Sequence, residues 1–443
     1  MLNTVLGNDS SASDKLIVEG GATGTTGLNI INAGGTGDAT VQDGIMVVEV
    51  AGTSAGSAFT LDGRVAAGAY EYFLFKGGVS ANTEDNWYLR NTIAAEPQVP
   101  TETPSSTPAP GTPALPPAPP PGSTPTELYR IEVPTYAVVP PVAHHLAVST
   151  LGTFHERRGE QTLLHGGRWL PTSWGRVLGQ NAEMDWSGTV APSFDGNLFG
   201  FQAGQDLLGR ESENGHHDRI GLFVGHASID GDVRGQALGW NDIAVGDVGV
   251  SGTSFGGYWT HIGPQGWYLD GILMGTWFSG DATSNSNVGV DIDGTGVTAS
   301  LEGGYPFALT PQWTLEPQAQ LIWNHLSLDD QRDRFSSVSF DSDDVVTGRL
   351  GLRLQGNFQA DMGTMQPYLK ANLWHNFSAD QTTRFDDNPI ITEIGGTSLE
   401  LGGGIVTELT GKVSLFATAD YTFDVDGGKT RIFEGNIGLN VKW

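Results

Sequence analysis

The chain has 443 residues, enough for two or three domains, and its 63 glycines and 16% charged residues do not suit a single soluble globule. A net charge of −28 argues against a nucleic-acid partner, because phosphate binding requires a basic face. No stretch approaches 18 consecutive apolar residues, so we expect no transmembrane helix, and the lack of cysteine suits an exported chain.

Residues 1–13 contain neither the basic nor the apolar region of a signal peptide. Because the rest of the chain indicates export, we expect that the sequence begins inside a longer protein. Residues 1–92 form the first of four predicted segments. Short apolar runs, such as 45–50 and 70–75, are separated there by glycine-containing turns. Each run is too short to bury a core alone, so we predict a short β-solenoid.

Residues 93–126 form the second segment, a predicted linker. Twelve of the 23 prolines lie between positions 97 and 125. Proline fixes φ and lacks the backbone donor, so this stretch should form neither sheet nor helix. We predict an extended spacer, which at ~3.1 Å per residue could reach about 90 Å. Its simplest role is that of a tether without a specific partner.

Residues 127–164 form the third segment, which contains a predicted helix near 141–158. Pro140 precedes this helix, two arginines lie in its last turn and Gly159 follows it, which are typical start and stop signals. Its apolar residues recur at helical spacing, and the others are small or polar. About 18 residues span roughly 27 Å, close to the hydrocarbon thickness of a bilayer. A helix of such mixed polarity could cross a membrane only inside a polar pore.

Residues 165–443 form the last segment and contain regular alternating strands. From Phe433 onward, apolar residues at odd positions alternate with polar residues or glycine, as a strand between lipid and a lumen requires. The predicted fold class is all-β: a 12-stranded antiparallel outer-membrane β-barrel with the helix in its lumen. Closure is needed because an open edge would leave unpaired backbone groups in lipid. The strands are expected near 174–184, 199–208, 219–228, 251–260, 267–278, 297–307, 314–325, 346–355, 369–377, 398–407, 413–423 and 433–443.

The polar face of these strands carries charges of both signs, which suit a wet lumen. A soluble β-sandwich with one wet face is the alternative, but this chain has more strands than a sandwich usually holds. We expect the two arginines of the polar face to pair with carboxylates on the helix or across the lumen. The charges expected to face one another in the lumen are Arg349, Arg353, Lys370, Glu302 and Glu434 on the strands and Glu156 on the helix.

This order of segments resembles the classical, pertactin-like autotransporters of Gram-negative bacteria, which use type V secretion. Residues 129–137 and 150–159 match the helix region of that family, and residues 174–177 resemble its first strand. Residues 66–72 and 85–90 resemble the end of a pertactin-like passenger, the exported part, which often promotes folding. The resemblance covers essentially the whole chain.

The resemblance implies a translocator that exports its own N-terminal passenger and displays it on the cell surface. It implies an outer-membrane location, with residues 1–92 exposed at the surface and a monomeric barrel in outer-membrane lipid. It also implies help from the barrel-assembly machinery and periplasmic chaperones. The assembly signal would be the apolar face of the last strand, although simple lipid contact explains each residue equally well: Phe433, Ile437, Leu439, Val441 and Trp443.

One departure concerns passenger release. Some family members cut themselves at an Asn-Asn pair in the pore helix, whereas this helix contains His144 and His145. That route is therefore in doubt for this chain. The alternative function is a surface adhesin that keeps its passenger on the barrel and binds a host or neighbouring cell.

We predict no enzyme, no cofactor and no metal site. Residues 1–92 contain no histidine, so a Ser–His pair cannot form there. Adjacent histidines without a cysteine or carboxylate at fixed spacing are weak evidence for metal, and an acidic run is more typical of a solvated loop than of a Ca²⁺ site. An outer-membrane hydrolase remains a third reading, because two histidines lie at apolar positions of strands. The residues weighed in this way are His144, His145, His216, His217, Asp341, Asp343, Asp344, His325 and His375.

Overall fold

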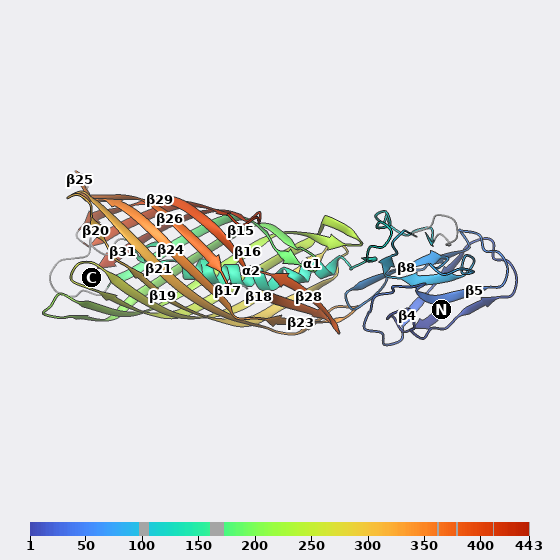
Figure 1. Cartoon of the computed structure of the whole chain (residues 1–443). Coiled ribbons are helices and arrows are strands. Elements are labelled where there is room, and N and C mark those ends of the chain that lie inside the picture. Colours follow the sequence, from blue (N-terminus) through green and yellow to red (C-terminus); the bar gives the residue numbers. More distant parts are fainter. Residues whose placement is uncertain (97–105, 160–171, 361–362, 378–379, 411, 443) are drawn as a thin grey trace.

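The computed structural model of the protein describes residues 1–96, 106–159, 172–360, 363–377, 380–410 and 412–442. A short N-terminal solenoid and a long barrel lie end to end, so the molecule is elongated (Figure 1). Helices run from the junction into the barrel. Among the described residues, no helix is both long and apolar enough to cross a bilayer.

Twelve long strands of the described chain form the barrel. Neighbouring strands pair antiparallel, and the last strand returns to the first, which places Lys442 opposite Thr172. This closure leaves no open edge, and it confirms the predicted fold class. The strands are β13 (Thr172–Asp185), β15 (Ser193–Glu211), β16 (His217–Ala237), β17 (Trp240–Ile262), β18 (Tyr268–Ser284), β19 (Gly289–Gly304), β21 (Trp313–Leu328), β24 (Val345–Gly356), β26 (Gly363–Asn376), β29 (Gly396–Thr410), β30 (Val413–Asp424) and β31 (Arg431–Lys442).

Alternation along each strand gives the barrel an apolar outside and a polar inside. In β24, Leu350 and Leu352 are exposed, whereas Arg349 and Arg353 are buried. The same period of two recurs around the barrel, because successive side chains of a strand point to opposite faces. A continuous apolar outer surface is unfavourable in water and stable in hydrocarbon. The barrel is therefore built to lie in a membrane.

The solenoid, residues 1–96, begins with short parallel pairs. Strands β1, β2 and β3 pair in parallel with β4, β5 and β6, as stacked coils do. Strands β8 and β9 then pair antiparallel and bury Tyr72 and Trp87 completely. The strands are β1 (Leu2–Thr4), β2 (Leu16–Val18), β3 (Thr26–Leu28), β4 (Ile30–Asn32), β5 (Ile45–Val50), β6 (Phe59–Leu61), β7 (Val65–Ala67), β8 (Tyr70–Lys76), β9 (Trp87–Arg90) and β10 (Thr92–Ile93).

The proline-rich stretch differs from the free spacer predicted above. Strand β11 (Thr107–Pro108) pairs with β8, and β12 (Thr126–Glu127) pairs with β10. The Ala109 amide donates to the Leu74 carbonyl over 2.8 Å. The expectation that this stretch forms no sheet is wrong, because residues between prolines keep their donors and an edge strand tolerates proline. Residues 97–105 lie outside the described chain.

The helical segment begins earlier than predicted and is broken. Helix α1 (Glu132–Ala137) continues through a turn into α2 (Val139–Leu151), and α3 (Phe154–Arg158) follows. The single helix predicted near 141–158 is therefore wrong in its bounds. Gly152, with φ of 64°, ends α2, and Thr153 caps α3 through a reciprocal capping box with Glu156.

Loops at the solenoid end of the barrel form a second, smaller sheet, called the mouth sheet below. It packs against α1, which contacts β27 and β28. At the opposite end, two short strands, β20 (Phe307–Ala308) and β25 (Phe358–Ala360), extend hairpins of the barrel. The mouth sheet consists of β14 (Ser187–Gly188), β22 (Gln331–Arg332), β23 (Ser337–Ser342), β27 (Asp380–Phe385) and β28 (Asn388–Glu393).

The membrane assignment predicts different costs for one substitution at two equally exposed sites. Leu369, in the middle of β26, is 66% exposed, and Ile17 of the solenoid is 67% exposed. Leu369→Arg should lower the free energy of unfolding in lipid vesicles by about 2–4 kcal/mol, because it places a charge in hydrocarbon. Ile17→Arg should change it by less than about 0.5 kcal/mol. Denaturant titration of both variants provides the measurement, and equal effects would contradict a lipid-facing barrel wall.

Candidate functional site

The lumen of the barrel is occupied by α2 and α3, which together are called the plug. In α2, Val142, Ala143 and Leu146 are completely buried. They belong to one apolar cluster with inward residues of the strands, such as Ala227 and Val250. Apolar packing thus holds the part of the plug near the solenoid, and farther along polar contacts join the apolar ones.

Helix α3 carries two arginines that meet carboxylates on different strands. Arg157 pairs with Asp270 of β18, which also accepts a hydrogen bond from Thr260. Arg158 lies 2.9 Å from Asp206 of β15. All four charged groups are essentially inaccessible to solvent. Because a buried charge without a partner is strongly unfavourable, these pairs fix the rotation and depth of α3.

A second set of contacts joins α3 to β19 and β21, which follow β18 around the barrel. His155 Nε2 lies 2.8 Å from Glu316 Oε1 of β21. The backbone amide of Phe154 donates to Glu302 of β19 over 2.8 Å. Arg349 of β24 approaches that same Glu302 carboxylate at 2.9 Å. Helix α3 is therefore anchored to strands on several sides of the lumen.

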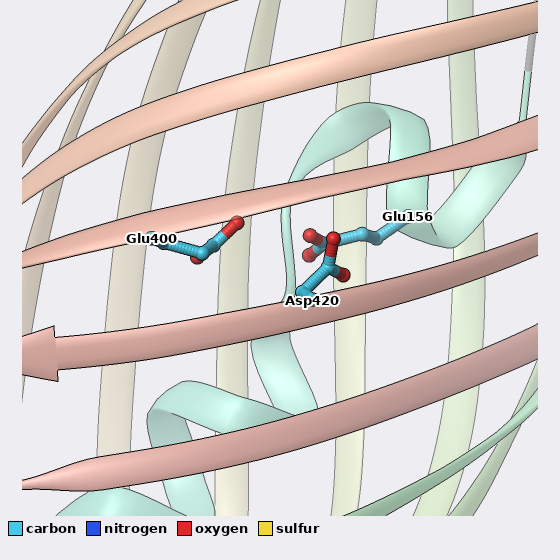
Figure 2. A group of neighbouring side chains, drawn as sticks. All are labelled: Glu156, Glu400 and Asp420. Atoms are coloured by element: carbon cyan, nitrogen blue, oxygen red, sulfur yellow. The ribbon is translucent and has the colours of Figure 1, made fainter.

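Lys370 of β26 is the centre of the densest ionic cluster. Its Nζ atom lies 2.5 Å from Glu156 of α3, 2.8 Å from Glu400 of β29 and 3.0 Å from Asp420 of β30. Figure 2 shows the three carboxylates converging from the plug and two strands. One oxygen from each lies within 4.8 Å of the others, a spacing that could hold a metal ion. The Lys370 ammonium already supplies the cation here, so the group serves as an ion-pair cluster.

The backbone of the plug is also held by the lumen wall. Asn436 and Asn440 of β31 donate to the carbonyls of Glu156 and Arg158, over 3.0 and 2.9 Å. At the break between the helices, a Cβ atom on Gly152 would lie 2.5 Å from a guanidinium nitrogen of Arg176. This close approach and the positive φ together require glycine at that position.

The sequence-predicted lumen charges occupy the following places. Arg349 and Glu302 form one ion pair, and Lys370 and Glu156 form another. Arg353 lies 4.2 Å above the Tyr368 ring centroid and donates to Gln355. Glu434 accepts a hydrogen bond from Gln180 over 2.6 Å. The apolar residues of the last strand are exposed (Phe433, Ile437 and Leu439) or half-buried (Val441), and Trp443 lies outside the described residues.

The ion pairs of Arg157 and Arg158 are not predictable from the sequence pattern. The sequence pattern marks Arg157 and Arg158 only as helix-end signals, and Asp206, the partner of Arg158, lies in a strand whose alternation is weak. An available signal was the run of charged residues at 155–158, since a helix crossing a polar lumen needs a partner for each charge.

The candidate metal ligands of α2 make ordinary polar contacts. His144 Nδ1 lies 3.0 Å from Asn324 Oδ1, and His145 Nε2 lies 2.8 Å from Gln180 Oε1. Beside α2, a cavity of about 680 Å³ extends from Glu156 toward loops at the mouth. The plug thus fills only part of the lumen and leaves a cavity lined by both polar and apolar residues next to it.

A closed barrel with a lipid-facing wall and a lumen filled by its own chain defines a plugged outer-membrane β-barrel. The family model described as the autotransporter beta-domain matches residues 173–420, and that of the type 1 autochaperone domain matches residues 1–74. The chain belongs to the autotransporter family, and it lies in the outer membrane with its N-terminal part exposed at the cell surface.

Relatives align along nearly the whole chain. The adhesin BmaC autotransporter of Brucella suis is 29% identical over 99% of this chain, but that alignment covers only 13% of the adhesin. The pertactin autotransporter of Bordetella bronchiseptica is 30% identical over 94% of this chain and 44% of the relative. YdeU of Escherichia coli is 29% identical over 100% of this chain and 94% of its own length. The transport unit of AIDA-I from E. coli shares the fold, with a TM-score of 0.58, 18% identity, and coverage of 71% of this chain and 100% of that chain.

A buried ion pair should contribute more to the free energy of unfolding than an exposed ion pair of the same residue types. Arg157→Met would leave the Asp270 carboxylate buried without its partner, so we expect a loss of about 3–5 kcal/mol in the free energy of unfolding. Arg234 and Asp242 form an exposed pair, and Arg234→Met should cost less than about 1 kcal/mol. Equilibrium unfolding in lipid vesicles measures both changes. Equal losses would show that the plug pair contributes no more than a surface pair.

Proposed function

We propose that residues 132–442 export the N-terminal part of the chain and then hold it at the cell surface. The path of the chain carries this proposal. It leaves the solenoid, enters the barrel mouth at α1, runs through the lumen as α2 and α3, and reaches Gly159 beside Asn440 of β31. Strand β13 begins at that same end, opposite Lys442. A chain threaded in this way is what export through or together with the barrel would leave behind.

Contacts between the solenoid and the barrel support display rather than release. Asn388, the first residue of β28, donates to the Gly37 carbonyl over 3.0 Å and accepts from the Ala69 amide over 3.1 Å. Arg130 donates to the Gly68 carbonyl over 2.7 Å and pairs with Asp333 at 2.5 Å. These contacts seat the last part of the solenoid on the mouth of the barrel.

An ionic bridge joins the solenoid to the first helix as well. Arg64 lies 2.7 Å from both Glu71 of β8 and Glu132 of α1. Burial raises the pKa of the Glu71 carboxyl, and the Arg64 guanidinium opposes that shift. Ser284 of β18 donates to Glu132 over 2.9 Å. The solenoid, the helix and the barrel wall therefore share one hydrogen-bonded network, which suits a passenger that stays attached.

A retained solenoid makes adhesion the second candidate function. Two relatives carry that role in their names, the adhesin BmaC autotransporter and the autotransporter adhesin AIDA-I of E. coli. The chain spans 13% and 33% of the length of those relatives.

We further propose a non-enzymatic role and help from assembly partners. The hydrogen bonds of the outward histidines His325 and His375 go to Asp344 and Thr397, and in the described residues neither has a serine partner. The outward apolar face of β31 suits recognition by the barrel-assembly machinery after escort by periplasmic chaperones. The barrel closes on itself without a second copy, which suits a monomer.

The proposed orientation predicts which end of the molecule a reagent outside the cell can reach. The chain contains no cysteine, so a single introduced thiol reports on one position. Ile17→Cys in the solenoid should react on intact cells with a maleimide polymer too large to cross porins. Glu213→Cys, in the exposed turn between β15 and β16, should react only after the outer membrane is permeabilised. Labelling of Glu213→Cys on intact cells, or none of Ile17→Cys, would refute surface display.

A further inference from the structure

A histidine of a turn and a histidine of a strand meet at the end of the barrel that faces the periplasm. His216 closes the turn between β15 and β16, and His261 lies near the end of β17. The Nδ1 atom of His216 lies 3.1 Å from Nε2 of His261. Hydrogen bonds between Ser212 and His216 fix this turn, since each backbone amide donates to an oxygen of the other residue. The two imidazoles are thus held with one nitrogen of each facing the other.

A carboxylate orients one of these rings. Asp218 of β16 lies directly across from His261 in the β16–β17 ladder, and its Oδ1 atom is 2.8 Å from His261 Nδ1. Trp259 Nε1 donates to that same oxygen over 3.1 Å, which holds the carboxylate in place. When His261 Nδ1–H donates to Asp218, its Nε2 atom carries the free lone pair. This carboxylate–histidine arrangement is the one that commonly supports metal-binding imidazoles.

The distance between the two facing nitrogens suits a shared metal ion. For Zn–N bonds of about 2.0–2.1 Å and tetrahedral angles, two imidazole nitrogens lie about 3.3 Å apart. The observed separation of 3.1 Å is close to this value. The rings of both histidines also pack against Trp267, with centroids 6.1 and 5.2 Å away, which shields one side of the pair.

We propose that His216 and His261 form a binding site for a divalent transition metal, with Asp218 as the positioning residue. Imidazole ligands select Zn²⁺, Cu²⁺ or Ni²⁺ over Ca²⁺ and Mg²⁺. Water completes the coordination. Among the described residues, no carboxylate or further imidazole lies close enough to serve as a third ligand. The bound ion would tie the β15–β16 turn to β17 on the periplasmic rim. This inference does not depend on export or adhesion.

The simpler alternative is a direct hydrogen bond between the two rings, in which a proton occupies the place of the metal. The two cases differ in a titration with metal. Full-length protein without a polyhistidine tag, stripped with chelator and held in detergent, is titrated with ZnCl₂ in a calorimeter. We expect one site that is lost in both His216→Ala and His261→Ala. Asp218→Asn should weaken it about 10- to 100-fold, as loss of an orienting carboxylate does.

The matched control is His226→Ala. His226 also lies on the outer face and contacts Thr253 at 3.0 Å, but it has no histidine partner among the described contacts. That variant should bind zinc as the unchanged protein does. Absence of zinc binding by the unchanged protein would overturn the proposal. So would zinc binding by His216→Ala or His261→Ala as tight as that of the unchanged protein.

A second measurement avoids variants that fail to fold. Electron paramagnetic resonance of the unchanged protein with one equivalent of Cu²⁺ reports the number of nitrogen ligands directly. Hyperfine coupling to two imidazole nitrogens would support the site. A spectrum with fewer than two coupled nitrogens would overturn it.

Discussion

The structure depends on the pairing of charges that are buried inside a membrane-embedded barrel. Helix α3 brings three charged side chains into the lumen at consecutive positions, and each meets an opposite charge on a different strand: Glu156 with Lys370, Arg157 with Asp270, and Arg158 with Asp206. None of these partners is close to the helix in the sequence. The plug is stable in one position only, because any rotation or slippage would separate several buried charges at once.

The same period of two builds the wall and the lumen together. Leu350 on β24 faces lipid, and its neighbour Arg349 reaches Glu302 inside. A shift of one residue in register would place the arginine in hydrocarbon. The register of the barrel strands is therefore strongly determined. It also sets the position of the plug, because the side chains that contact the plug all point into the lumen. The solenoid is aligned in turn, through Arg130 and Asn388 at the mouth.

Much of the fold follows from the sequence, because alternation is local and repeated. The pattern from Phe433 onward predicts β31, and similar patterns predict the other barrel strands. What could not be predicted depends on contacts between distant segments. The break at Gly152 reflects the position of Arg176 in space, and β11 forms because β8 offers it an edge.

Only part of the candidate site could be predicted from the sequence. Parity identified Arg349, Lys370 and Glu302 as inward charges, but it could not say which carboxylate each cation meets. The pairing of His216 with His261 could not be predicted from the sequence either. The adjacent His217 is the obvious partner in the sequence, whereas the structure supplies one 45 positions away.

The most direct test of ion pairing in the plug is a double-mutant cycle on Glu156 and Lys370, with the open probability of the pore in planar bilayers as the measurement. In the unchanged protein, Glu156→Gln removes a partner of Lys370 and should raise the open probability. In a Lys370→Met background, Glu156→Gln relieves the charge repulsion between Glu156 and the carboxylates of Glu400 and Asp420, and it should lower the open probability. The sign of the effect should therefore reverse, with a coupling of about 0.5–3 kcal/mol. Equal effects of Glu156→Gln in both backgrounds would contradict a plug held by this cluster.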